Sequence, residues 1–139
     1  PMPMRPFILL IALSGLPHLA CATDEDSSAP ACAPDATAFA QEVWPTYLAP
    51  ADPAKSCVAR GGCHDASNMP ASRLRFQVAA PIDHQANYQA LLAFVDCDEP
   101  IDSAALTKPL AGTNPHVGGD IFASSQDPAV ISFIAWLTP

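Results

Sequence analysis

The sequence has few basic residues and no apolar run of membrane-spanning length near its start. Six Lys and Arg stand against 14 Asp and Glu among 139 residues, so the formal net charge is −8. Such an acidic chain is a poor partner for nucleic acid or for an anionic membrane surface. The apolar run at residues 7–16 is too short to cross a bilayer as a helix.

Catalytic motifs are also missing. The sequence contains no Gly-x-Ser-x-Gly, no His-Glu-x-x-His, no phosphate-cradling glycine loop and no internal repeat. Asp96, Asp98 and Glu99 cluster beside Cys97, but a run of carboxylates on a loop is typical of a solvated face, and its spacing is not that of a calcium loop. An enzyme with its own turnover is therefore not indicated.

The sequence is rich in proline and in apolar residues. Sixteen prolines predict a loop-rich chain, and the hydrophobic fraction of 50% argues against disorder. The length leaves room for a single small domain.

The first residues resemble a secretion signal. Arg5 provides a positive start, residues 7–16 an apolar stretch, and Ala20-x-Ala22 a site for signal peptidase. The Ala-Cys pair ending at Cys21 resembles a bacterial lipoprotein site, in which Cys21 carries the lipid. The alternative is release of the protein without a lipid.

These features divide the chain into three parts. We expect a signal peptide or lipoprotein leader at 1–21, a flexible acidic linker at 22–35 and one domain at 36–139. The protein is then exported, either to the periplasm or to the outer membrane or cell surface, with a membrane attachment through the lipid on Cys21.

Helical patterns recur along the domain. Asp35 or Thr37 caps a first helix, which Pro45 kinks or ends. Its apolar face carries Phe39, Val43 and Tyr47. An amphipathic helix follows at 87–95 and a short one at 103–108. The last helix has Asp127 as its N-cap, Pro128 at its first position, and an apolar face formed by Val130, Phe133, Ile134 and Leu137.

Long loops separate these helices. Residues 49–70 are rich in proline, glycine and small residues, 73–78 alternate like a short extended stretch, and 112–120 form a glycine-containing loop that lets the backbone approach a neighbour closely. The expected fold is a small, mostly helical domain with long ordered loops.

Four cysteines lie beyond the leader: Cys32, Cys57, Cys63 and Cys97. In an oxidising compartment they predict two disulfides, with three possible connectivities. A structural metal site formed by Cys57, Cys63 and either Cys97 or His116 is another alternative.

The neighbouring pair Cys63-His64 favours a different chemistry. Adjacent side chains converge poorly on one zinc ion, whereas covalent haem uses a cysteine at the porphyrin edge and the next histidine on the iron. Cys57 is the second candidate for attachment, although five residues separate it from Cys63 where the usual haem motif has two. Gly61 and Gly62 make this wider loop conformable.

Further residues complete the haem hypothesis. His116, between the glycines of the 112–120 loop, is the candidate for the sixth iron ligand. Arg73 and Arg75 are candidates to pair with the haem propionates. His84 is expected on the surface.

Short motifs resemble, in their order, the small c-type cytochrome-like domains of exported bacterial proteins. They are Phe39-x-x-Glu42-Val-Trp-Pro45, Gly62-Cys63-His64, Leu74-Arg-Phe76, Asn87-Tyr88-x-x-Leu91, Ser103-x-x-Leu106-x-Lys108-Pro109, His116-Val-Gly-Gly-Asp-Ile-Phe122 and Ile134-Ala-Trp-Leu137. The resemblance implies a cytochrome c-like fold with haem c, attached through Cys57 and Cys63, His64 as proximal ligand and His116 as distal ligand.

Two functions from different classes follow. The first is a monohaem electron carrier or accessory redox subunit with two histidine ligands and an unidentified redox partner protein. On this hypothesis a disulfide is expected at Cys32 and Cys97. The second is a cofactor-free exported interaction module that uses all four of these cysteines in disulfides.

Overall fold

The computed structural model describes residues 32–68 and 72–138. The expected signal peptide at 1–21, the lipidation site Cys21 and most of the expected linker lie outside the described residues. Within the described residues, no helix combines the length and apolar character needed to cross a bilayer.

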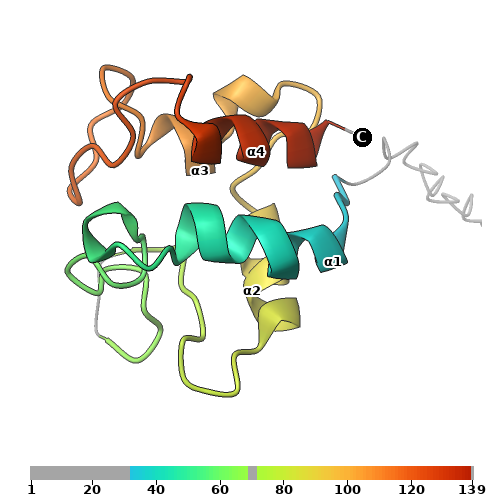
Figure 1. The fold of residues 1–139 in the computed structure, drawn as a ribbon, viewed down its shortest axis with the longest axis vertical. Coiled ribbons are helices and arrows are strands. Elements are labelled where there is room, and N and C mark those ends of the chain that lie inside the picture. The colour runs from blue at the N-terminus through green and yellow to red at the C-terminus, as the bar shows by residue number, and fades with distance from the viewer. Residues whose placement is uncertain (1–31, 69–71, 139) are drawn as a thin grey trace, which may run out of the picture.

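The described chain is mostly helical, as expected. Its elements are α1 (Ala36–Ala38), η1 (Phe39–Leu48), η2 (Pro53–Lys55), α2 (His84–Leu92), η3 (Pro100–Asp102), α3 (Ala104–Thr107) and α4 (Pro128–Leu137). In the same residues β structure is limited to two isolated parallel bridges, Asp65 with Phe76 and Leu110 with Phe122. In Figure 1, α4 and α3 form an upper layer and α1 with η1 a lower one, with α2 beneath.

Of the two expected effects of Pro45, a kink or an end of the first helix, the structure excludes the end, because the helix continues past it to Leu48. Asp35 caps α1 by accepting from the Ala38 N–H, and the helix then widens into the π-helix η1 with Pro45 inside it. The π register, closed by Ala49 N donating to Trp44 O at 2.8 Å, lets the chain pass a residue that has no N–H. The helix keeps one buried face, formed by Phe39, Val43, Trp44, Tyr47 and Leu48.

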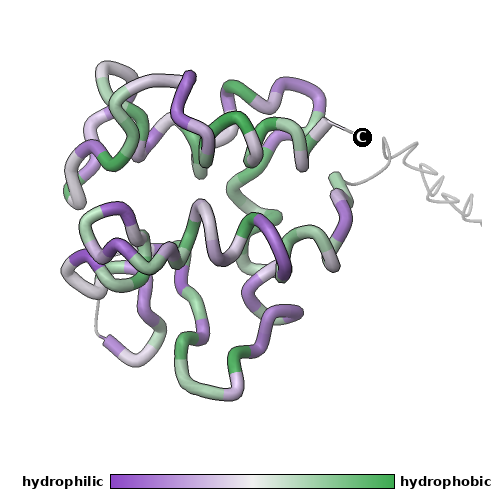
Figure 2. Tube along the Cα trace, in the orientation of Figure 1, coloured by the Kyte–Doolittle hydropathy of each residue, from purple (hydrophilic) through white to green (hydrophobic). Residues whose placement is uncertain are grey.

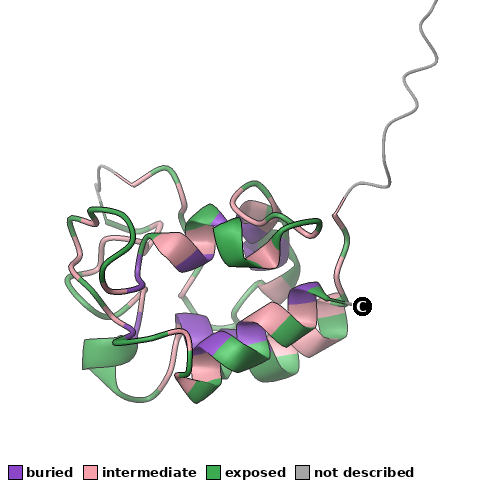
Figure 3. Cartoon of the chain, turned by 90° about the horizontal axis from the view of Figure 1, so that it is seen from above, coloured by how far each residue is buried: buried purple, intermediate pink, exposed green. Residues whose placement is uncertain are grey.

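An aromatic core holds η1 against α4. The Tyr47 ring stacks on Phe133 at a centroid distance of 4.2 Å and on Phe122 at 4.8 Å. The Tyr47 hydroxyl donates to the Ala105 carbonyl at 2.9 Å, so the core contains no unpaired phenol. Figure 2 shows α4 as largely hydrophobic and α2 as mostly hydrophilic, and Figure 3 shows that the helices carry both buried and exposed residues, while the loops are mostly exposed or intermediate.

The other helices follow their local signals closely. α2 begins at His84, three residues before the expected start, because the Asp83 carboxylate caps it by accepting from Ala86 N at 2.8 Å. α3 lies inside the expected 103–108 span. α4 begins at Pro128 after Asp127, whose carboxylate accepts from Ala129 N, as predicted.

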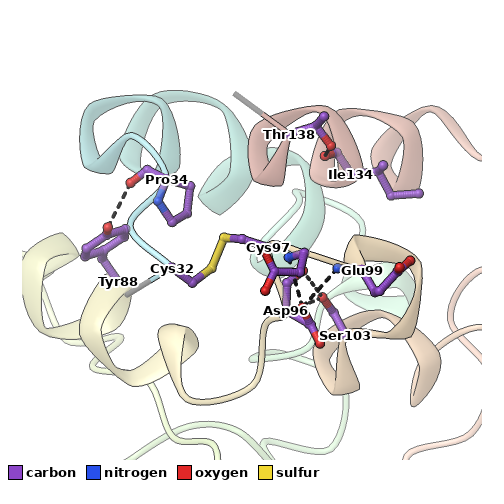
Figure 4. The surroundings of a disulfide bond; sticks show 10 residues. Cys32, Pro34, Tyr88, Asp96, Cys97, Glu99, Ser103, Ile134 and Thr138 are labelled. Atoms are coloured by element: carbon purple, nitrogen blue, oxygen red, sulfur yellow. Dashed lines mark hydrogen bonds between the residues drawn. A yellow bond between two sulfur atoms is a disulfide. The ribbon is translucent and has the colours of Figure 1, made fainter. Parts of the chain in front are cut away.

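The start of the domain is fastened to its body. A disulfide joins Cys32 to Cys97, which confirms that expected pair. Two side chains also donate to the backbone of the 32–35 segment, Tyr88 to Pro34 O and Trp136 to Asp35 O, each at 2.8 Å. The disulfide and the Tyr88 bond are visible in Figure 4. The last four residues of the expected linker therefore pack with the domain.

Candidate functional site

A cavity of about 660 Å³ opens between the loops of the two layers. This volume lies within the range of about 300–1,000 Å³ usual for small-molecule and cofactor sites. Its walls come from residues far apart in sequence: 57–74 in part, 104–109 in part, 115–118, Leu48 and Phe94. Both His64 and His116 line it.

His64 is held by the extended segment that follows it. Its Nδ1 lies 2.9 Å from the Leu74 carbonyl oxygen and 2.9 Å from the Ser72 hydroxyl oxygen. Its backbone carbonyl accepts from Phe76 N at 2.7 Å. Because a carbonyl only accepts, this network assigns the ring proton to Nδ1 and leaves the Nε2 lone pair free. Metal-binding histidines in proteins are oriented in this way.

His116 has the same polarity with a different support. Its Nδ1 lies 3.2 Å from the Gly119 carbonyl oxygen, so Nε2 again carries the free lone pair. Gly119 N donates back to His116 O at 2.8 Å, in a turn that needs the positive φ of 73° at Gly119. A Cβ at Gly118 would lie only 3.0 Å from Cε1 of the His116 ring. The glycines therefore let the ring lie against its own turn.

The two imidazoles lie close to each other in the cavity lining. Their ring centres are 6.0 Å apart and their planes are inclined by 29°. A metal ion bonded to one nitrogen of each ring at about 2 Å needs a separation of this order. Among the described residues no group of three or more His, Cys, Asp and Glu is arranged to hold a metal ion. Two opposed imidazoles are, however, the protein ligand set of a six-coordinate haem, whose macrocycle provides the other four.

Burial favours the neutral form of His64. Desolvation lowers its pKa below the ordinary 6.5, and the charge of a protonated His116 lowers it further, while the bond to the Leu74 carbonyl acts in the opposite direction. A neutral imidazole is the form that binds metals.

Cys57 and Cys63 are free and both line the cavity. Burial raises the pKa of the Cys57 thiol to about 12, and its Sγ lies 4.0 Å from the Tyr47 carbonyl oxygen. The structure therefore contains one disulfide of the two that the cofactor-free alternative expects, within the described residues. Cys97 is bonded to Cys32, so a metal site that includes Cys97 is wrong.

Of the two arginines expected to pair with the propionates, only one lines the cavity. Arg73 lines the cavity, whereas the Arg75 guanidinium donates to the carbonyls of Ala66 and Asn68 and is not part of the lining. Lys108, at the end of α3, lines the cavity instead. In the sequence, Lys108 stands within a motif of the resemblance, but nothing there predicted that it lines the site.

Two other groups of residues have structural roles. His84 is half-buried and packs edge-on against Trp44, with ring centres 5.6 Å apart, so it is not the surface residue that we expected. Asp96 accepts from the N–H groups of Asp98 and Glu99 at 3.0 Å each, which makes the acidic cluster a turn (Figure 4).

Comparisons of the chain with family models, with curated proteins and with solved structures gave no match. Function is therefore inferred from the residues around the cavity.

Proposed function

We propose that the chain is a haem-binding electron-transfer protein, resembling monohaem c-type cytochromes, with His64 and His116 as the two axial ligands. One observation carries this proposal: two imidazoles from distant segments, each with its Nδ1 bonded to a carbonyl, line one cavity with their ring centres 6.0 Å apart. A surface histidine pair has no need of such matched orientation.

The surrounding residues suit this role. The cavity walls include Leu48, Leu74 and Phe94, which exclude water and lower the local dielectric. Cys63 precedes His64, and Cys57 lines the same cavity, so both thiols are candidates for covalent attachment of haem c. Arg73 and Lys108 line the cavity and provide positive charge for the two propionate carboxylates of a haem.

A bound haem supplies a one-electron couple, and its potential depends on axial ligands and burial. With both axial positions taken by histidine, the resting protein is a carrier or accessory redox subunit, which exchanges electrons with a partner protein. Export, with anchoring through a lipid on Cys21, is the cellular setting that we propose for it.

The test is expression in a host that matures c-type cytochromes. We expect a coloured protein with a low-spin reduced spectrum, and a mass gain of one haem that persists after denaturation. Haem colour without the mass gain means non-covalent binding. A colourless protein with the unmodified chain mass, less the hydrogens of its disulfides, contradicts the proposal and favours the cofactor-free module.

Single substitutions assign the roles. His64→Ala should abolish haem binding or leave a high-spin spectrum, and His116→Ala should convert the low-spin spectrum to high-spin. His84→Ala, which removes a histidine outside the cavity, is the matched control and should leave the spectrum unchanged. Cys57→Ala and Cys63→Ala, each followed by intact mass, show which sulfur holds the group across the five-residue gap.

A further inference from the structure

The two histidines are anchored with unequal strength. His64 is tied to a different segment by its ring, through Leu74 and Ser72, and by its backbone, through Phe76. Phe76 is itself buried in the core and packs against Trp44 with ring centres 5.5 Å apart. Moving His64 therefore requires breaking core contacts.

His116 is held mainly by its own turn. The hydrogen bonds of its ring and of its carbonyl both go to Gly119, three residues away. The neighbouring Val117 side chain is fully exposed, so no packing covers the turn from outside. Gly112 and Gly119, with φ of 75° and 73°, flank this turn, and the Cβ position of Gly112 faces open space. The turn and its histidine can therefore move together at low cost.

Arg60 links the end of this turn to the other layer. Its guanidinium donates to Asp120 O at 3.0 Å and to Ala54 O at 3.4 Å. The same guanidinium lies 3.4 Å from where a Cβ at Gly119 would be. These bonds are exposed, and exposed hydrogen bonds of this kind exchange readily with water.

We propose, resting on the proposed function, that a small neutral molecule that donates an electron pair, as carbon monoxide does, binds at the position that His116 occupies. The 112–119 turn would carry His116 outward, and the donor would take the place that His116 leaves. With haem bound, His116 would release the iron together with its own Nε2 electron pair, and the incoming molecule would donate a pair in its place. No proton or electron is exchanged, so no further reactant is needed.

The test uses the reduced, haem-loaded protein and carbon monoxide as the probe. We expect the wild-type spectrum to change on addition, at a rate that levels off at high concentration because departure of His116 becomes limiting. A minor open state populated at about 0.1–10% predicts about 10- to 1,000-fold tighter binding in His116→Ala. In that variant the rate should rise linearly with concentration.

A second variant tests the turn without removing a ligand. Arg60→Ala should leave the spectrum unchanged before carbon monoxide is added and should raise the limiting rate several-fold. Lys55→Ala is the matched control, since Lys55 is an exposed cation whose contact is a 4.0 Å pair with Asp127, outside the turn. It should behave as the wild type.

The outcomes separate the two proposals. If the wild type binds haem but its reduced spectrum ignores carbon monoxide while His116→Ala binds it, His116 is a fixed ligand and this inference is overturned. Equal limiting rates in Arg60→Ala and the wild type overturn the role of the turn. A protein that takes up no haem overturns the proposed function and this inference with it.

Discussion

The two ends of the domain are built by different means. At one end, η1 and α4 bury stacked aromatic rings, and the disulfide with its neighbouring hydrogen bonds fastens residues 32–35. At the other end, loops from both layers surround the cavity and hold each histidine through carbonyl oxygens. The fold is stabilised where the chain is helical, and the candidate chemistry lies where it is not. Stability and ligand geometry should therefore respond to different substitutions.

The largest expected effect lies at the fastened end. Replacing both Cys32 and Cys97 by serine opens a loop of 65 residues, and the chain-entropy relation gives a loss of about 4 kcal/mol in the free energy of unfolding. Urea denaturation measures this loss. His64 and His116 should remain as they are, because neither contacts the disulfide. If the NMR signals of His64 or His116 change in the folded variant, the two ends are not independent.

Asn87 is the point where the two ends are coupled. Its buried side chain accepts from Gln77 N at 2.7 Å and donates to Gln77 O at 2.9 Å, which joins α2 to the segment that holds His64. Asn87→Ala removes both of these hydrogen bonds to Gln77, so we expect a loss of about 1–3 kcal/mol in the free energy of unfolding together with weaker haem binding. Urea denaturation and haem titration measure both.

Asn87→Asp is the control, because it keeps the acceptor for Gln77 N. With its carboxyl group protonated at low pH it can also donate to Gln77 O and should lie between Asn87→Ala and the wild type, whereas at neutral pH the buried carboxylate faces that carbonyl oxygen and should make it no more stable than Asn87→Ala. A stability loss without any change in haem binding shows that Asn87 serves the helical end alone.

The next effect concerns two glycines of the 112–120 loop, Gly112 and Gly118. Gly118→Ala places a Cβ 3.0 Å from Cε1 of His116, so it should displace the ring while changing stability by less than about 0.5 kcal/mol. Gly112→Ala meets no atom but forces alanine to a φ of 75°, which costs about 1–2 kcal/mol. Gly118→Ala should therefore change the NMR signals of the His116 ring with little effect on the denaturation curve. Gly112→Ala should lower the stability with little effect on those signals.

The smallest effect is a pH dependence at the cavity end. His64 has a lowered pKa in the folded protein, so below the ordinary value of 6.5 the unfolded chain binds more protons than the folded one. Stability from this group is present above that pH and is lost as pH falls through the folded pKa. The free energy of unfolding of the haem-free protein, measured between neutral pH and about pH 5, should fall less steeply as pH is lowered in His64→Asn than in the wild type. An identical slope contradicts the assignment to His64.

Local cap chemistry made some helices predictable from sequence. Asp127 before Pro128 marks the start of α4, because both residues act on the first turn itself. Pro45 left open whether the first helix kinks or ends there, and burial of Trp44 and Leu48 favours continuing the helix in a π register. That preference comes from packing with distant segments, which a local rule does not contain.

The candidate site divides in a similar way. The adjacency of Cys63 and His64, and the glycines around His116, are local signals, so the sequence alone predicted these residues as candidates for the site. Lys108 and Phe94 reach the cavity only through the fold. Arg75 was expected beside a propionate, but nearby carbonyl groups bind its guanidinium first. Whether a basic side chain is available to a ligand therefore depends on whether backbone carbonyl groups already bind it.

The way the chain enters the domain has a mechanical consequence. In Figure 1 the chain enters at the side where α4 ends, whereas the loops that carry His64 and His116 lie at the opposite side. Tension applied through the residues before Cys32 passes across the covalent sulfur bridge to Cys97 and does not unwind α1. A domain pulled or anchored from this point keeps its histidine loops unloaded and directed away from the attachment.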